Sequence, residues 1–269
     1  MSKHNKSTRQ QKILAELTLH PATRLTELAK KIDVSRETIR RDLDELSDNG
    51  IISRTYGGAI VHPRGGEEGL KVRDATFVEQ RRAIAATAAG LVKSNEVIML
   101  GTGSSTLHFA RHLATSDLRL TVITSGVDVA MVLAVNPGIR TILAPGDFDS
   151  RESRVWGAET TNFLRKFQAD TTIIGASGLF PGGACEADSP TAWIDRVMLE
   201  RANHKMLLIL HTKFDQPKLE LICPLETFDV IISDQKPQGE LLDAIASAGV
   251  TLKIATSTPS SLAATASAS

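Results

Sequence analysis

Three arginines stand within six positions of one another, at Arg36, Arg40 and Arg41. If Ile39 faces a core, a turn of 100° per residue puts Glu37 and Arg41 on the opposite side of the helix. A guanidinium group binds phosphate oxygens and the O6/N7 edge of guanine equally well. The run therefore predicts the leading end of a recognition helix for double-stranded DNA. A solvated helix with Arg40–Asp44 and Arg41–Glu45 ion pairs would show the same pattern. The candidate DNA-binding residues here are Ser35, Arg36, Glu37, Thr38, Arg40 and Arg41.

A second polar run, Gly101-Thr102-Gly103-Ser104-Ser105-Thr106, directly follows an apolar stretch. Glycines allow a close backbone approach, and the free N–H groups at a helix start form a site for an anion. A dinucleotide-binding fingerprint is excluded, because Thr106 stands where the third glycine belongs and the next strand ends without an acid. A Walker A loop lacks its Gly-Lys pair. The run predicts an anion site, although an ordinary strand–helix turn would also explain it.

Histidine and cysteine offer weaker signals. His108 and His112 have the i, i+4 spacing of a metal-binding helix, but Phe109 stands where a zinc protease has its Glu, and no third ligand is evident. We therefore predict no metal site and no cofactor. Cys185, which we place in a loop, could be a reactive thiol, but a bystander role is expected.

These residues need elements to position them. Apolar periodicity predicts helices over about 9–19, 26–32 and 35–47, followed by a short hairpin over 51–61. Ser35 is a good N-cap residue, and Asn49-Gly50 suits a helix end. Two helices joined by a tight turn and followed by a hairpin are typical of a winged helix-turn-helix. Arg54, with Tyr56 and Gly57 at the hairpin turn, could contact a phosphate.

The remaining chain alternates apolar runs with helical stretches. Strands are expected near 96–100, 120–124, 141–144, 171–175, 206–210, 230–233 and 251–254, with helices between most of them. This alternation predicts an α/β fold with a doubly wound, mostly parallel sheet covered on both faces. We expect a DNA-binding domain over 1–61, a linker over 62–75, an effector-binding domain over 76–254, and a disordered Ala/Ser/Thr tail over 255–269.

Composition limits the class of protein. The chain has 269 residues, 42% hydrophobic and 23% charged, which is typical of a soluble globular protein. No apolar run approaches the ~18 residues of a membrane span, no signal peptide is evident, and two cysteines fit a reducing cytosol. The zero net charge divides into +4 for residues 1–65 (12 basic, 8 acidic) and −4 for the rest (19 basic, 23 acidic). We therefore expect a cytoplasmic protein with no membrane partner and a polyanion partner at its N-terminal end.

Two runs, Val34-Ser35-x-x-Thr38-Ile39-Arg40-Arg41-Asp42-Leu43 and Arg54-Thr55-x-Gly57-Gly58-Ala59, closely resemble the DeoR family of bacterial transcriptional regulators. The resemblance continues through about residues 77–254. It implies a winged helix-turn-helix joined to a sensor domain that resembles ribose-5-phosphate isomerase. It also implies a repressor of carbohydrate catabolic genes that is relieved by a phosphorylated sugar or a related metabolite.

The resemblance implies further ligand-facing positions at strand ends. With the polar run they make the candidate effector set Gly101, Thr102, Gly103, Ser104, Ser105, Thr106, Thr124, Ser125, Gly146, Asp147 and Lys213. The chain departs from the family pattern at Pro145, at His211 in place of Asp, at Thr191 in place of Glu, and at Asp195 in place of Lys. Acids of the 182–188 loop, such as Glu186, could take the role of the missing Glu.

The sequence thus predicts a DNA-binding regulator, not an enzyme, that acts as a homo-oligomer, dimer or tetramer, because paired domains bind repeated half-sites. Two alternatives stay open. One is a sugar-phosphate isomerase with an appended helix-turn-helix, in which Asp147, Asp149 or Glu186 would serve as the base. The other is an activator or a dual regulator.

Overall fold

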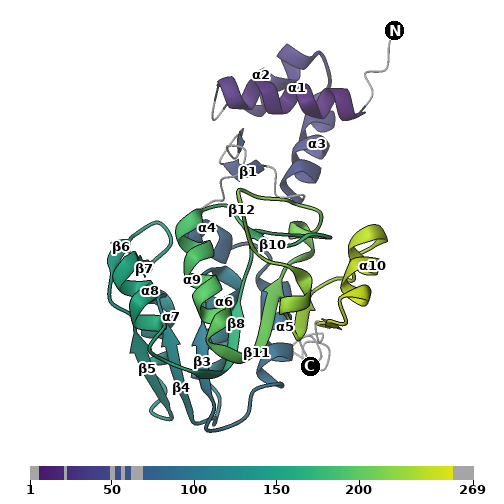
Figure 1. Cartoon of the computed structure of the whole chain (residues 1–269). Coiled ribbons are helices and arrows are strands. Elements are labelled where there is room, and N and C mark those ends of the chain that lie inside the picture. Colours follow the sequence, from purple (N-terminus) through teal and green to yellow (C-terminus); the bar gives the residue numbers. More distant parts are fainter. Residues whose placement is uncertain (1–5, 21–22, 49–51, 56–57, 62–68, 257–269) are drawn as a thin grey trace, which may run out of the picture. The chain divides into compact units, whose positions relative to one another are not determined.

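The computed structural model describes residues 6–20, 23–48, 52–55, 58–61 and 69–256 (Figure 1). The chain divides into two compact units, Met1–Glu68 and Gly69–Ser269. Among the described residues, no helix is both long and apolar enough to cross a membrane. Residues 62–68 and 257–269, which carry part of the expected linker and nearly all of the expected tail, lie outside the described residues.

The first unit consists of three helices and a hairpin, as the sequence predicts. The helices are α1 (Lys6–Leu19), α2 (Leu25–Ile32) and α3 (Arg36–Asp48), and strands β1 (Ile52–Thr55) and β2 (Gly58–Val61) pair antiparallel. Their apolar faces meet in one core that contains Ile13, Leu17, Leu28, Ala29, Ile32, Ile39, Leu43, Leu46 and Ile52. This small core fixes the angle at which α3 presents its other face.

The turn between α2 and α3 is set by two residues. Asp33 takes the left-handed conformation (φ 58°) and ends α2, and the Val34 N–H donates to the Ala29 carbonyl. Ser35 begins α3, because its Oγ accepts from the Thr38 N–H at 3.1 Å. The predicted helix-turn-helix is therefore confirmed in its local geometry.

The second unit is built on a seven-stranded parallel sheet of order β14-β13-β11-β8-β3-β4-β5. Its strands are β3 (Val97–Leu100), β4 (Leu120–Thr124), β5 (Ile139–Leu143), β8 (Ala169–Ile174), β11 (Ala202–Ile209), β13 (Val230–Ser233) and β14 (Thr251–Ile254). The chain extends from β3 through β4 to β5 on one side, and from β8 to β14 on the other. The direction therefore reverses between β3 and β8, which is where sheets of this kind bind ligands.

Helices cover both faces of this sheet (Figure 1). One apolar cluster joins it to α5 (Val78–Ala89), α6 (Ser104–Ala114) and α7 (Val127–Leu133). Clusters on the other face include α8 (Ala158–Leu164), α9 (Ser189–Glu200) and α10 (Gly239–Ser247). Neighbouring residues of one strand, such as Ile98 and Met99, belong to opposite clusters. The doubly wound fold predicted from the sequence is confirmed.

Short elements around this frame correct the sequence prediction. The sequence missed the hairpin β6 (Asp147–Asp149) and β7 (Arg154–Trp156), and the small sheet of β9 (Gly178–Phe180), β10 (Gly183–Glu186) and β12 (Glu220–Cys223). It also missed two single turns, η1 (His211–Lys213) and η2 (Leu225–Thr227). Strands of three or four residues are too short to show a period. For this reason the sequence placed Cys185 in a loop, whereas in the structure it is buried in β10. Burial raises the pKa of its thiol.

The predicted linker was too long at its C-terminal end. Residues 70–74 form helix α4 (Leu70–Asp74), because Leu70 is buried in the same cluster as α5 and α6. The predicted tail began one residue too early, since Ala255 is buried and its N–H donates to the Ser233 carbonyl. Both errors lie where a few apolar residues stand among polar ones.

Candidate DNA interface and effector site

Helix α3 separates its residues by chemistry. Ile39, Leu43 and Leu46 are buried, whereas the candidate DNA-binding residues face solvent, with Ser35, Arg36, Glu37, Arg40 and Arg41 exposed and Thr38 half-buried. The side chain of Arg41 is 80% exposed and its Nε lies 3.5 Å from Glu37. The leading end of α3 thus offers guanidinium groups that a DNA duplex can reach.

Two acids of α3, Asp42 and Glu45, contact α1. Asp42 is buried and accepts from Arg9 Nη2 at 2.9 Å. Glu45 accepts from Lys6 at 2.7 Å and from Gln10 at 3.1 Å. In the solvated-helix alternative Arg41 would pair with Glu45, but in the structure Arg41 lies beside Glu37 and Glu45 binds residues of α1. This arrangement removes two negative charges from the face that carries the arginines.

Among the hairpin candidates, the structure describes the backbone of Arg54. Arg54 lies in β1, where it pairs with Ala59 of β2. Tyr56 and Gly57, the other two hairpin candidates, lie outside the described residues.

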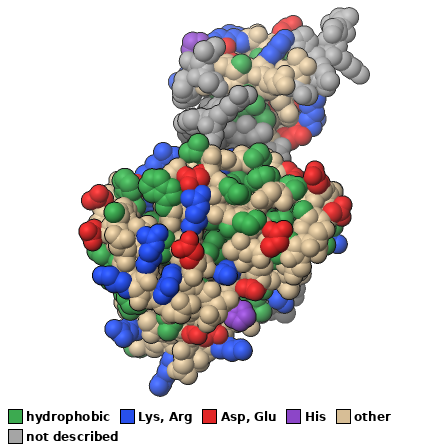
Figure 2. Space-filling model, viewed as in Figure 1, with side chains coloured by type: hydrophobic (Ala, Val, Ile, Leu, Met, Phe, Trp, Pro, Cys, Tyr) green, Lys and Arg blue, Asp and Glu red, His purple; other side chains and the backbone are tan. Residues whose placement is uncertain are grey.

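The surface of the second unit has a mixed charge. On the face drawn in Figure 2, its basic side chains are interspersed with acidic ones.

The Gly101–Thr106 loop leads from β3 into α6, at the point where the strand order reverses. The Gly101 N–H donates to the Ile173 carbonyl of β8 at 2.9 Å. Gly103 is the N-cap of α6 with φ +116°, and no side chain caps the helix. Ser104, Ser105 and Thr106 form its buried first turn, whose N–H groups have no acceptor within the helix. The loop therefore has the backbone form of an anion site.

Loops from neighbouring strands lie against this one. A Cβ on Gly126 would lie 3.4 Å from Thr102, so the Thr124–Gly126 turn contacts the loop. Thr124 Oγ1 accepts from the Gly126 N–H at 3.0 Å. The Ser125 hydroxyl is fully buried and has no hydrogen-bond partner among the described residues. A buried hydroxyl without a partner is costly.

For the remaining predicted effector residues, the contacts described below are with parts of the second unit other than the Gly101–Thr106 loop. Gly146 (φ +152°) is explained by packing, since a Cβ there would meet Thr160 Oγ1 at 2.2 Å. Asp147 is exposed in β6, and among the described residues it makes no hydrogen bond to the loop. Lys213 is half-buried in η1. His211 anchors that turn, because its N–H and Nδ1 both contact Asp234, at 2.8 Å and 2.5 Å.

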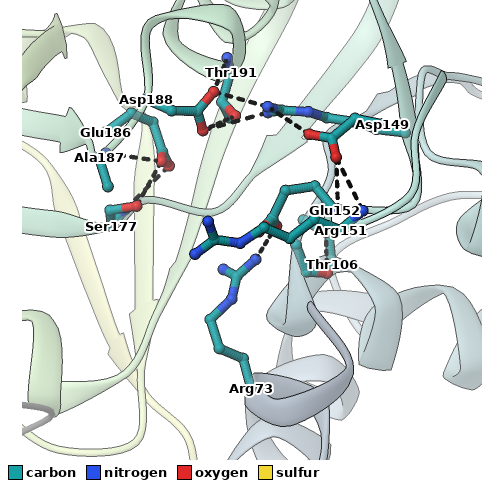
Figure 3. Close-up of polar contacts among 12 residues, drawn as sticks. Arg73, Thr106, Asp149, Arg151, Glu152, Ser177, Glu186, Ala187, Asp188 and Thr191 are labelled. Atoms are coloured by element: carbon teal, nitrogen blue, oxygen red, sulfur yellow. Dashed lines mark hydrogen bonds and ion pairs between the residues drawn. The ribbon is translucent and has the colours of Figure 1, made fainter. Parts of the chain in front are cut away.

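Acidic side chains lie behind the loop where the family pattern has other groups. Asp195 is buried, and its Oδ1 would lie 3.4 Å from a Cβ on Gly101. Burial, followed by the charge of Glu186, raises the pKa of Asp195 well above its ordinary value. Glu186 accepts from the Ser177 N–H at 3.1 Å and from its hydroxyl at 2.5 Å (Figure 3). A protonated Asp195 would not repel an anion in the loop.

A buried arginine of the β6–β7 hairpin pairs with two further acids. Arg154 is 4% exposed and binds Asp188 at 2.8 Å and Asp149 at 3.3 Å. Burial alone would raise the pKa of Asp188, but hydrogen bonds and the charge of Arg154 bring that pKa below its ordinary value. Asp188 also caps α9 by accepting from Thr191, which explains the departure at that position (Figure 3).

The structure adds one residue that sequence reasoning missed. Arg81 of α5 is 4% exposed, and its Nη1 donates to Ser105 Oγ in the loop at 2.7 Å. A signal existed, because Arg81 stands at i of an i, i+3, i+4, i+7 stripe with Ile84, Ala85 and Ala88, all of them buried. An arginine in a core stripe is unusual enough to mark a polar site.

The two histidines considered for metal binding have other surroundings. His108 is buried with its Nε2 3.3 Å from Asp74, and His112 is on the same helix. Burial lowers the pKa of His108. Among the described residues, no group of three or more His, Cys, Asp or Glu side chains could hold a metal ion.

Comparison with known proteins decides the family. The model of the DeoR C terminal sensor domain matches residues 76–235, and that of the DeoR-like helix-turn-helix domain matches residues 9–64. The chain belongs to the DeoR family. It is 32% identical to the HTH-type transcriptional regulator GolR of Listeria innocua, over 92% of this chain and 98% of that protein. It is 28% identical to the glycerol-3-phosphate regulon repressor of Escherichia coli, over 85% of this chain and 90% of that protein.

The solved structures that match part of this chain at low similarity include a ribose-5-phosphate isomerase. The enzyme of Methanocaldococcus jannaschii matches 51% of this DeoR-family chain over 54% of the enzyme's own length, at 20% identity and a TM-score of 0.37.

The two family models and the likeness to GolR show that this DeoR-family protein is a DNA-binding transcriptional regulator with a sensor domain, as its sequence predicts.

Proposed function

We propose that this protein represses carbohydrate catabolic genes and that a phosphorylated sugar relieves the repression. Residues 1–61 would bind operator DNA through α3 and the hairpin, and the second unit would bind the effector. The proposal that α3 binds DNA rests on its solvent-facing side, where Arg36, Arg40 and Arg41 are exposed. Two acids of the same helix, Asp42 and Glu45, contact α1 instead. Repression by the glycerol-3-phosphate regulon repressor, a relative, supports the sign of the regulation.

The effector half is supported by the loop between β3 and α6. Its uncapped N–H groups, the adjacent Ser125 hydroxyl without a partner and the place at the strand-order reversal all suit a small anionic ligand. The effector set of Gly101–Thr106, Thr124 and Ser125 is supported by these contacts. Gly146, Asp147 and Lys213 remain predictions from the family resemblance.

The assembly is proposed to be a homo-oligomer, at least a dimer, acting in the cytoplasm where its DNA lies. Paired half-sites require paired α3 helices. The second unit has its own core around the sheet, so removal of residues 1–65 should leave a folded body. That body should sediment as an oligomer at micromolar concentration, and a monomer would contradict the idea that it pairs the DNA-binding units.

Two of the three carboxylates that the enzyme alternative names are already engaged. Glu186 already accepts two hydrogen bonds from Ser177, and Asp149 binds Arg154 and two backbone N–H groups. A carboxylate so engaged is a poor proton acceptor. Isomerisation of pentose or hexose phosphates by the purified protein would restore this alternative.

The experiment uses the purified protein and the DNA upstream of its own gene. We expect tight binding that glycerol 3-phosphate, ribose 5-phosphate, fructose 1-phosphate or glucose 6-phosphate reverses, and that the matching unphosphorylated compound does not. In cells, loss of the gene should raise transcription from that DNA. A fall in transcription would identify an activator instead.

A further inference from the structure

Helix α4 is the first element of the second unit, so it is the element that follows the DNA-binding unit in the sequence. Leu70 is buried, and its N–H donates at 3.1 Å to the carbonyl of Arg151, in the turn between β6 and β7. Arg73 forms an ion pair with Glu152 of the same turn, and each of the two side chains is 16% exposed (Figure 3). Two neighbouring residues of the turn therefore hold α4, one through a backbone hydrogen bond and one through a partly buried ion pair.

The C-terminal end of α4 is held by α6. Asp74 is bound by both terminal nitrogens of Arg111, at 2.6 Å and 2.7 Å, and His108 Nε2 lies 3.3 Å from the same carboxylate. Burial alone would raise the pKa of Asp74, but the hydrogen bonds and the charge of Arg111 bring that pKa below its ordinary value. Helix α6 begins at the Gly101–Thr106 loop, so α4 is bound to an element that starts in the proposed effector site.

The β6–β7 hairpin is bonded to the proposed effector site as well. The Val155 N–H donates to the Ser125 carbonyl at 2.8 Å. The Val127 N–H donates to the Ser153 carbonyl at the same distance. These bonds join β7 to the turn after β4, and that turn contacts Thr102 of the loop. One hairpin thus connects the proposed effector site with α4.

The turn of the hairpin is tied to its strands. Asp149 Oδ1 accepts from the Arg151 N–H at 2.9 Å and from the Glu152 N–H at 3.4 Å. The other oxygen of Asp149 accepts from Arg154 of β7 at 3.3 Å. Ser153 has the left-handed conformation (φ 48°), which costs free energy in a residue other than glycine and persists only where the surroundings hold it. A displacement of β7 is therefore passed to the turn and is not absorbed by it.

We propose that α4 couples the effector site to the DNA-binding unit, and that the Arg73–Glu152 pair carries this coupling. The inference rests on the proposed function and assigns the regulation of that same site. A ligand that moves the turn after β4 also moves β7, which is bonded to that turn, and the hairpin then moves α4. Helix α4, next in sequence to the DNA-binding unit, is thus placed differently with and without ligand. Such a difference between two states is what release of DNA requires.

The test breaks the Arg73–Glu152 pair and then rebuilds it in reverse. Arg73→Gln and Glu152→Gln each remove one charge and keep a polar side chain. The double variant Arg73→Glu with Glu152→Arg restores the pair with its charges exchanged. Two controls remove a charge elsewhere: Lys71→Met at an exposed position of α4, and Arg82→Met at an exposed ion pair with Glu79 at 2.8 Å. The unfolding temperature of each variant shows that it is folded.

The first measurement starts from the DNA side and uses no effector. Amide exchange of the full chain is compared with and without the DNA upstream of its own gene. In the parent and both controls, we expect bound DNA to change exchange at residues 70–75 and 147–156 as well as in α3. In Arg73→Gln and Glu152→Gln, the change at 147–156 should be lost and the change in α3 should remain. With DNA bound, an unresponsive hairpin in the parent, or an equal response in both variants, would overturn the coupling. A parent that does not bind this DNA would overturn the proposed function itself.

The second measurement is the ratio of the operator Kd with and without sugar phosphate. The probe is whichever of glycerol 3-phosphate, ribose 5-phosphate, fructose 1-phosphate or glucose 6-phosphate releases the parent. We expect Arg73→Gln and Glu152→Gln to lower this ratio by about threefold or more, and the reversed pair to restore it. Linkage requires that the effect of DNA on the affinity for the sugar phosphate falls by the same factor.

A ratio equal to that of the parent in both single variants would show that the Arg73–Glu152 pair only anchors α4. A ratio that stays low in the reversed pair would show that the charges act separately and not as a pair. If no sugar phosphate releases the parent, the proposed effector is wrong, and the exchange measurement still decides whether the hairpin and the DNA-binding unit are linked.

Discussion

The DNA-binding face and the effector loop place their arginines in opposite ways. Arg41 of α3 is 80% exposed, whereas Arg81 beside the loop is 4% exposed and Arg154 behind the strand ends is equally buried. A DNA duplex is large and rigid, so the groups that bind it must stand out from the surface. A small anion can be enclosed, and enclosure strengthens each polar contact because the local dielectric constant is low.

This contrast separates the expected consequences of mutation. Exposed groups on α3 contribute to binding and little to folding, because water already solvates them. Buried polar groups near the loop contribute to both, since removing one leaves its partners without compensation. Variants on α3 should therefore change one property, and variants near the loop should change two.

The largest effect is expected for Arg154→Met. The substitution leaves Asp149 and Asp188 without their buried partner, and breaking such a pair costs about 3 kcal/mol here, because both acids remain partly exposed. Both tryptophans, Trp156 and Trp193, lie in the second unit, so their fluorescence in urea follows that unit alone. Arg82→Met, at an exposed pair, should change the unfolding free energy by about 0.5 kcal/mol or less.

The Arg154 variant should also alter the pH dependence. The pKa of Asp188 is lowered in the folded protein, so its stabilising contribution is present above the unfolded pKa and is lost as pH falls through the folded one. The parent should therefore lose stability below about pH 4, and Arg154→Met should lose less over that range. An equal loss in both proteins would show that the Arg154–Asp188 pair does not set that pKa.

A smaller effect, confined to DNA, is expected on α3. Arg40→Ala and Arg41→Ala should each weaken operator binding by about 1–3 kcal/mol and leave the unfolding free energy unchanged within about 0.5 kcal/mol. Fluorescence anisotropy with operator DNA at several salt concentrations measures both the affinity and the number of phosphates contacted. Operator affinity equal to that of the parent in both variants would show that α3 does not bind the DNA as assigned.

An effect on the pH dependence of stability is expected at Asp195, and its size grows with the difference between the folded and the ordinary pKa. Its pKa is raised, so the stability associated with its proton is present below the unfolded pKa and declines as pH rises toward the folded one. Asp195→Asn imitates the protonated acid, so the unfolding temperature of the variant should rise relative to that of the parent as the pH increases above about 4. Parallel curves over that range would mean that Asp195 is already ionised when folded.

The same contrast explains what could be predicted from the sequence. The proposed DNA-binding face lies within one helix, so the spacing of Ile39, Arg40 and Arg41 was enough to predict which side chains are buried and which face solvent. The parallel sheet was predictable because each strand is a run of apolar residues. The proposed effector site is assembled from residues 20 to 90 positions apart, such as Ser105, Ser125 and Asp195, and local spacing does not show which of them meet. Arg81 was missed because it lies on a helix before the loop, and Cys185 because a four-residue strand has no visible period.

The central claim is that the Gly101–Thr106 loop binds the phosphate whose arrival releases DNA. Gly103 has φ +116° and only Thr106 Oγ1, at 4.0 Å, near the position of a Cβ, so valine there would add bulk on the open side of the loop. Gly249→Val is the matched control, with φ +71° and no atom within 4 Å, at the opposite end of the strands. The decisive measurement is an operator-binding titration of the parent and both variants with phosphorylated and unphosphorylated sugars. We predict that all three proteins bind operator equally, and that phosphorylated sugar releases the parent and Gly249→Val but not Gly103→Val. Release of Gly103→Val at the parent's ligand concentration would show that the loop is a structural turn and that the effector binds elsewhere.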